Sequence, residues 1–174
     1  MTAIENTPLN KNFLNPLNFQ FQLKRAPTLN FFCQKINIPS LTLQIIDVPN
    51  AFNYLPNAAN KVQYGELEVT FKVDENFQNY LEIHNWVRAL GFPEKFEEYK
   101  EIAKNPQVTG EGIKSDIGMI ILNAVKKPNY EITFKDAFPT FLSAIDFDAT
   151  SDDVQYVTAS ATFRYTLFDI KKIT

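Results

Sequence analysis

Hydrophobic and polar residues alternate along several short segments of the chain, which is the pattern of half-buried β-strands. Phe19, Phe21 and Leu23 alternate with polar residues near the start, and residues 67–73 and 157–167 show the same period. Further strands are predicted at residues 31–38, 41–48, 117–125, 130–135 and 142–148. The pattern therefore predicts a mainly β protein.

One segment changes to a helical period. Apolar residues recur at helical spacing between Tyr80 and Leu90, and Gly91 with Pro93 is a typical helix stop. We expect an amphipathic helix over residues 77–90 and a short second helix over residues 94–104. Short strands interrupted by helix favour an α+β fold built on an antiparallel β-sandwich or barrel, with the amphipathic helix flanking it.

Two proline-broken segments show no period: residues 1–17 and residues 49–61. A structureless loop longer than about 12 residues is uncommon in compact domains, and disordered linkers seldom carry so much apolar surface. We expect the second segment to be an extended loop that packs against a neighbouring subunit, with a lid over its own core as the alternative. The first segment is expected to be an arm that docks either on its own domain or on a neighbour. The candidate contact residues are Leu9, Phe13, Leu14, Phe52, Tyr54 and Leu55.

Composition narrows the functional classes. The 174 residues suit one domain, and a net charge of −3 with no basic stripe argues against a nucleic-acid binder. A single cysteine cannot form an internal disulfide, which favours a reducing compartment. No segment reaches the roughly 18 apolar residues of a membrane span, and the N-terminus lacks signal-peptide features, so we expect a soluble protein made in a cytoplasm, with no membrane insertion by this chain.

Side chains that could carry chemistry are sparse. His84 is the one histidine and Cys33 the one cysteine, whereas a zinc site needs several such ligands. Both are interpreted as structural, with a Cys33–His84 dyad as the weak alternative. Asp146 and Asp148 share a strand face, but acid–base catalysis also needs a cleft and a perturbed pKa. We therefore expect no enzyme activity, no catalytic residue, no metal and no cofactor.

Two stretches carry a family resemblance. Residues 130–169, "YEITFKDAFPTFLSAIDFDATSDDVQYVTASATFRYTLFD", resemble the end of tail tube proteins of contractile-tailed bacteriophages. Residues 67–86, "LEVTFKVDENFQNYLEIHNW", are similar to the strand-to-helix unit of that family. The likeness spans about residues 15–168 and is loosest at 92–113. It implies an N-terminal arm at 1–17, a single tube-type β domain at 18–170 and a helical insertion at 92–114.

The resemblance also implies a function. Tail tube subunits form rings of six copies that stack into a hollow tube inside a sheath and on a baseplate. DNA passes through the bore during ejection without sequence-specific binding. The expected location is the virion tail, assembled in the bacterial host cytoplasm. The alternatives are a tail terminator, a baseplate tube initiator or a type VI secretion-like tube, and, more distantly, a monomeric β-barrel that binds an apolar ligand.

Two polar strand faces compete as the candidate lining of the bore. We expect the apolar face of residues 66–73 to build the core, because its side chains alternate with polar ones. A bore that conducts DNA should be acidic or neutral, since each neutralised phosphate adds affinity. The first candidate lumen or interface face is Glu66, Glu68, Thr70 and Lys72. The competing face is Thr158, Ser160, Thr162 and Arg164.

Overall fold

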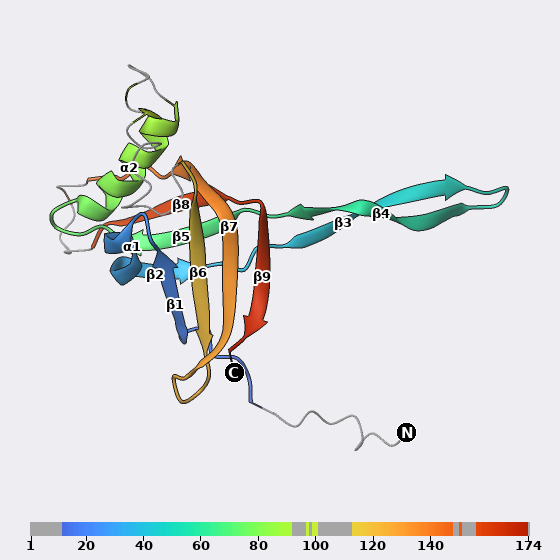
Figure 1. Ribbon diagram of the computed structural model, residues 1–174, viewed down its shortest axis with the longest axis horizontal. Coiled ribbons are helices and arrows are strands. Elements are labelled where there is room, and N and C mark those ends of the chain that lie inside the picture. Colours follow the sequence, from blue (N-terminus) through green and yellow to red (C-terminus); the bar gives the residue numbers. More distant parts are fainter. Residues whose placement is uncertain are drawn as a thin grey trace.

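The protein has a two-layered β body from which a long hairpin projects (Figure 1). The computed structural model describes residues 12–91, 97, 99, 100, 113–147, 150 and 156–173. The elements are β1 (Phe19–Leu23), α1 (Pro27–Phe32), β2 (Cys33–Ile36), β3 (Leu41–Pro49), β4 (Tyr54–Tyr64), β5 (Leu67–Lys72), α2 (Gln78–Gly91), β6 (Ser115–Leu122), β7 (Pro128–Leu142), β8 (Thr158–Arg164) and β9 (Leu167–Lys172).

The long strand β7 belongs to both layers. Its first half pairs with β6 and β9, and β6 pairs with β1; we call these strands the first sheet. Its second half, from Phe138 to Leu142, pairs with β8, which continues through β5 to β2; we call these strands the second sheet. The bend lies at Asp136, whose φ of 57° is in the left-handed region that aspartate tolerates better than most residues. Every pairing is antiparallel, as expected, but the sheets do not close into a barrel.

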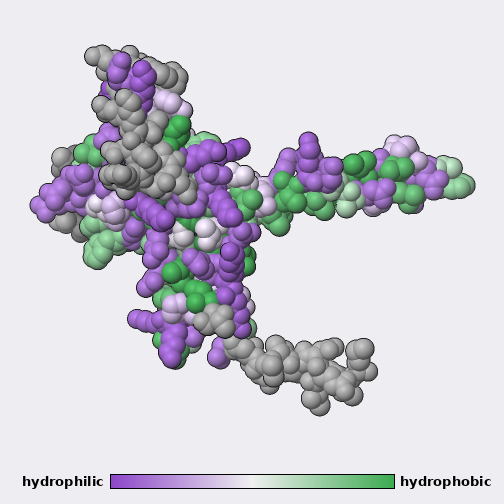
Figure 2. Space-filling model, viewed as in Figure 1, coloured by the Kyte–Doolittle hydropathy of each residue, from purple (hydrophilic) through white to green (hydrophobic). Residues whose placement is uncertain are grey.

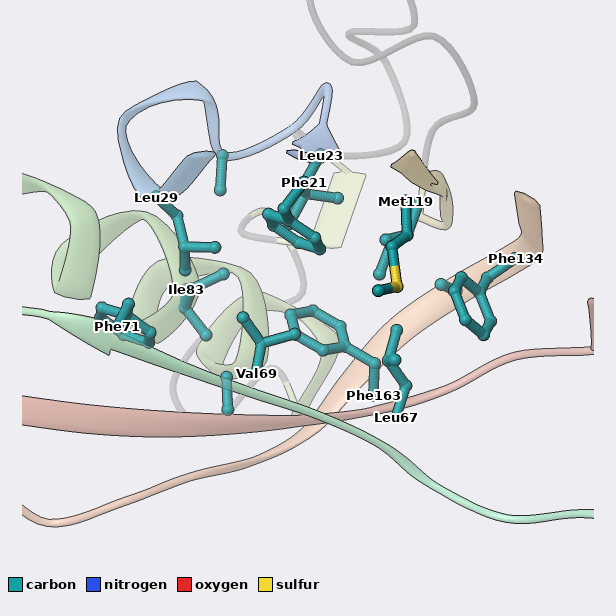
Figure 3. Packing of buried hydrophobic residues seen from close by; sticks show 14 of the residues in the cluster. Phe21, Leu23, Leu29, Leu67, Val69, Phe71, Ile83, Met119, Phe134 and Phe163 are labelled. Carbon is teal, nitrogen blue, oxygen red and sulfur yellow. The ribbon is translucent and has the colours of Figure 1, made fainter. Parts of the chain in front are cut away.

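The apolar faces of the two sheets pack against each other. Leu67, Val69 and Phe71 of β5 are fully buried, so the prediction that this face builds the core is confirmed. Figure 3 shows them opposite Phe21 and Met119 of the first sheet. The predicted flanking helix is also confirmed: α2 adds Ile83 and Trp86 to the core, and the Trp86 indole N–H donates a 3.0 Å hydrogen bond to the Ile113 carbonyl.

Several predicted strand boundaries are wrong. Residues 31–38 are not one strand. Pro27 occupies the first turn of the short helix α1, a position that suits proline, and the helix continues to Phe32. Strand β2 therefore begins only at Cys33. The strand predicted at 142–148 does not form; β7 instead continues from the predicted strand at 130–135 through residues 136–141 and ends at Leu142. The C-terminal strand is divided at residues 165–166, where the chain crosses from the second sheet to the first.

The expectation of an irregular loop at 49–61 is also wrong. Residues 54–61 lie in β4, which pairs with β3 from Leu41 opposite Tyr64 to Pro49 opposite Tyr54. We call this hairpin, residues 41–64, the arm. Its two strands pair with no other strand of the described chain, so the prolines and asparagines of β4 interrupt no larger sheet. The predicted second helix and the insertion at 92–114 lie mostly outside the described residues, as do Leu9 and most of the N-terminal arm.

The base of the arm is fixed to the body by hydrogen bonds and aromatic contacts. The Tyr165 hydroxyl donates a 2.9 Å hydrogen bond to the Gly65 carbonyl, and the Gly65 amide donates a 2.9 Å bond to the Ser40 carbonyl. The ring of Tyr64 packs edge-on against those of Tyr165 and Phe168, with centroids 6.0 and 5.6 Å apart. The arm therefore leaves the body in a defined direction.

Gly65→Ala is expected to destabilise this base by about 1–3 kcal/mol, the usual range for overpacking. A Cβ atom at position 65 would lie 2.7 Å from the Ser40 Oγ and 3.1 Å from the Ser40 amide nitrogen. Urea unfolding monitored by circular dichroism measures the loss. Adding Ser40→Ala should recover part of it by removing the nearest atom, and an unchanged midpoint for the single variant would contradict the close approach.

Candidate functional surfaces

The two polar faces that compete as the bore lining are one surface. In the register between β5 and β8, Glu68 lies opposite Thr162, Thr70 opposite Ser160, and Lys72 opposite Thr158. Glu66 and Arg164 meet at the end of the same ladder. The pairing of two strands some 90 residues apart is decided by the tertiary structure. Sequence periodicity therefore identified each polar face but did not show that the two faces are adjacent. We call this surface, with Lys35 of β2 opposite Thr70, the polar face.

One ion pair and one cation–π contact engage charged side chains of the polar face. The Arg164 guanidinium donates from Nε and Nη2 to the Glu66 Oε1 at 2.9 and 2.6 Å. The Lys72 ammonium lies 3.4 Å from the centroid of the Tyr156 ring, a cation–π contact. Both partners of the exposed ion pair are solvated, so it adds little stability, but it neutralises charge locally. With three basic and two acidic side chains among hydroxyls, the polar face is close to neutral.

The second sheet has two open edges. No described strand pairs with the outer side of β2 or with the outer side of Phe138–Leu142 in β7. Open edges present unpaired amide and carbonyl groups that can join another chain. The four strands alternate in direction, so β2 of a second copy placed beside this part of β7 would again run antiparallel.

The arm exposes apolar side chains on both of its faces, and Figure 2 shows hydrophobic residues along the side that is in view. In the β3–β4 register, Ile45 and Tyr54 project from one face, at 68% and 72% exposure, while Ile46, Val48 and Leu55 project from the other. Phe52 at the tip is 96% exposed. A two-stranded ribbon is marginal in water, and large exposed apolar surfaces mark interaction sites. Phe13 and Leu14 of the N-terminal segment are exposed as well.

Three of the four candidate catalytic residues, Cys33, His84 and Asp146, lie in the described part of the chain. His84 is exposed, with its Nδ1 3.3 Å from the Asn85 side-chain oxygen, and Asp146 is exposed, while Asp148 lies outside the described residues. Within the described ranges, no three His, Cys, Asp or Glu side chains gather into a group that could hold a metal ion. No helix in the same part of the chain has the length and apolar character needed to cross a membrane.

Cys33 is expected to react about 100-fold more slowly with a thiol reagent at pH 8 than an ordinary cysteine. Burial raises the pKa of its thiol from 9.0 to about 11 and outweighs a backbone hydrogen bond at Lys35 that lowers it, so the nucleophilic thiolate is correspondingly scarce. Stopped-flow labelling measures the rate, and unfolding the chain in urea should restore it. A fast reaction in the folded state would revive Cys33 as a nucleophile.

The fold is a two-layered antiparallel β body with open sheet edges, an exposed polar face and an exposed apolar arm. The family model described as phage tail tube protein matches residues 4–171. The chain therefore belongs to the phage tail tube protein family, which is structural and not enzymatic, and the resemblance seen in the sequence is confirmed. No curated protein matches the chain.

Solved structures of the same fold come from contractile injection particles. The tube-terminating cap of the anti-feeding prophage has a TM-score of 0.63 at 15% identity, covering 99% of this chain and 100% of that one. A chain of the sheath–tube complex of an extracellular contractile injection system, PVC, has a TM-score of 0.63 at 14% identity, covering 94% of each. A chain of the anti-feeding prophage baseplate has a TM-score of 0.59 at 18% identity, covering 88% and 90%. Such low identities establish the fold alone.

Proposed function

We propose that this protein is the ring-forming subunit of the inner tail tube of a contractile particle. The observation that carries the proposal is the second sheet: it combines a wet, nearly neutral face with two open edges of matching polarity. Joining β2 of one copy to residues 138–142 of β7 of the next would continue one antiparallel sheet around a closed ring of six copies. The polar face would then line a water-filled bore, and the core would lie outside it.

The arm supports stacking of such rings. It leaves the body at the end of β5 that is remote from α2, and Figure 1 shows it extending roughly along the direction of that strand. If the strands of the second sheet line the bore, the arm points out of its own ring toward the next one. Burial of its apolar side chains against copies in that ring would contribute the hydrophobic free energy that holds the stack together.

We infer that the assembled tube conducts DNA during ejection inside a sheath and on a baseplate, in a virion tail that is assembled in the host cytoplasm. Each DNA phosphate that a basic side chain neutralises would increase the affinity of the bore for DNA and so slow its passage. On the polar face, the Glu66–Arg164 pair leaves one fewer cation available to DNA. A near-neutral, hydroxyl-rich lining suits a conduit that does not hold its cargo.

Adding positive charge to the polar face is expected to slow ejection by tenfold or more. The variant Thr70→Lys, Ser160→Lys, Thr162→Lys places three new cations on each copy without disturbing the Glu66–Arg164 pair. Ejection is measured from purified particles by fluorescence of released DNA at low and high salt, because screening should relieve the block. A control with Gln20→Lys and Gln22→Lys on exposed positions of β1 adds charge elsewhere. Normal ejection by the triple variant would show that the lumen assignment is wrong.

A tube-terminating role is the second candidate, because the anti-feeding prophage cap and the sheath–tube chain fit the protein equally well, with TM-scores of 0.63. Copy number separates the two roles: a tube subunit is present in many rings per particle, whereas a terminator forms one. Quantitative mass spectrometry of purified particles, with a baseplate protein as the internal standard, measures it. Particles with a single ring's worth of this chain would replace the tube proposal by the terminator. A baseplate ring would give the same count, and its place at the opposite end of the particle would distinguish it.

A further inference from the structure

An aromatic side chain stands uncovered beside one open edge of the second sheet. The short helix α1 packs on the core through Leu29, which is fully buried, and the Thr28 hydroxyl donates a 2.8 Å hydrogen bond to Glu82 Oε1 of α2. Phe31, on the same helix, is 85% exposed, and its aromatic ring packs edge-on against that of Phe32, with centroids 5.0 Å apart. Two residues later the chain enters β2, so Phe31 marks one end of this open edge.

A groove opens beside the opposite edge. It lies between α2 and the end of β7 and has a volume of about 340 Å³. Its lining is Tyr80, His84, Val87, Arg88, Thr140, Phe141 and Leu142. Four of these side chains are apolar or aromatic, and Phe141 is 54% exposed. A groove of this size and character suits an apolar side chain better than a charged one.

Phe31 and the groove lie at the same end of the second sheet. Cys33 at the start of β2 pairs with Phe71, near the end of β5 that leads into α2. At the other edge, the Tyr80 hydroxyl of α2 donates a 3.1 Å bond to the Ser143 carbonyl, just beyond the end of β7. Figure 1 shows α1 and α2 at this common end, with the arm at the opposite end.

We propose that Phe31 of one copy fills the α2–β7 groove of the next copy in the ring. This inference rests on the proposed ring of subunits. When β2 of one copy runs antiparallel beside β7 of another without an axial shift, the Phe31 side chain and the groove lie at the same height along the interface between the two copies. We infer that a second copy of the chain fills the groove, because Phe31 and the groove lie beside the two opposite open edges of one sheet, and these edges can pair with each other. The contact buries an exposed aromatic ring and sets the register of this interface, which backbone pairing alone leaves free to slip.

A photocrosslink tests the contact without removing the aromatic ring. A chain that carries Phe31→p-azidophenylalanine is assembled together with an excess of native chain labelled with ¹⁵N. Any crosslink between the unlabelled variant and a heavy peptide then joins two different copies. After irradiation of the purified particles, mass spectrometry is expected to find the crosslink in residues 80–88 or 140–142 of the heavy chain. Phe52→p-azidophenylalanine at the tip of the arm is the matched control and should not label those residues.

A second probe separates this contact from the ring itself. Gln34→p-azidophenylalanine, on the exposed edge strand β2, should label residues 138–142 of a heavy neighbour if the sheets join. If the probe at position 34 labels residues 138–142 but the probe at position 31 labels residues outside the groove, the proposed ring of subunits is supported and the Phe31 contact is refuted. If neither labels the neighbour's β7 side, the proposed ring falls together with the contact.

Discussion

Replacing both Ile45 and Ile46 by aspartate is expected to abolish tube assembly while leaving the subunit folded. These neighbours project from opposite faces of the arm and are 68% and 56% exposed in the free chain. Burying each isoleucine is worth about 1.5–3 kcal/mol, and burying an unpaired carboxylate costs several kcal/mol more. Because every copy in every ring would repeat the penalty, we expect at least a 100-fold loss of tubes. Electron microscopy counts the tubes.

The folded state provides the control for this result. Both side chains are exposed in the isolated subunit, so its melting temperature should shift by no more than about 2 °C. Thr42→Asp places the same charge on β3, at a position whose cross-strand neighbour Gln63 is polar, and it should reduce assembly far less. Tubes of normal length from the Ile45→Asp, Ile46→Asp variant would show that the arm does not hold rings together.

Phe163→Ala is expected to destabilise the subunit by about 3–5 kcal/mol, the usual cost of truncating a buried aromatic residue. Phe163 is fully buried in β8, pairs with Leu67 across the sheet, and has its ring centroid 6.1 Å from that of Trp86. Domains are commonly stable by about 5–15 kcal/mol, so this is a large share of the total. Urea unfolding followed by tryptophan fluorescence measures the loss.

The matched substitution is Phe52→Ala, which removes the same side chain from a position that is 96% exposed. It should leave the free energy of unfolding within about 0.5 kcal/mol of the native value. Carrying out both measurements in the Ile45→Asp, Ile46→Asp background keeps self-association out of the transition. Equal effects at positions 163 and 52 would contradict the core described for the two sheets.

The sequence predicted those elements whose periodicity is set by burial within the chain itself. The alternation of Leu67, Val69 and Phe71 and the helical spacing along α2 both reflect one apolar face packed on a core, and both elements were found where expected. The family resemblance rested partly on this strand-to-helix unit, residues 67–86, and partly on residues 130–169. The polar residues of β5 and β8 lie on the outward sides of their strands, because outward positions in a half-buried strand follow from the inward ones; their role as a bore lining stays a prediction.

Features decided by tertiary pairing escaped the sequence. The bend of β7 at Asp136 joins two segments that were predicted as separate strands, since residues 136–139 interrupt the alternation in the same way whether the chain turns back or bends between sheets. The arm was missed for a related reason. Neither of its faces rests on the body, so no inside–outside alternation marks β4, and only the partner strand β3 makes the segment regular.

The arm also has a consequence for production of the protein. An unassembled copy keeps a strip of isoleucine, valine, leucine and tyrosine in water on an unprotected two-stranded ribbon, which is a hazard for irregular clumping. The cell therefore has to hold the pool of free copies small. The end of a growing tube would keep this pool small if it incorporates copies as fast as they are synthesised. Overexpression of the chain in the absence of growing tubes should yield mostly insoluble protein.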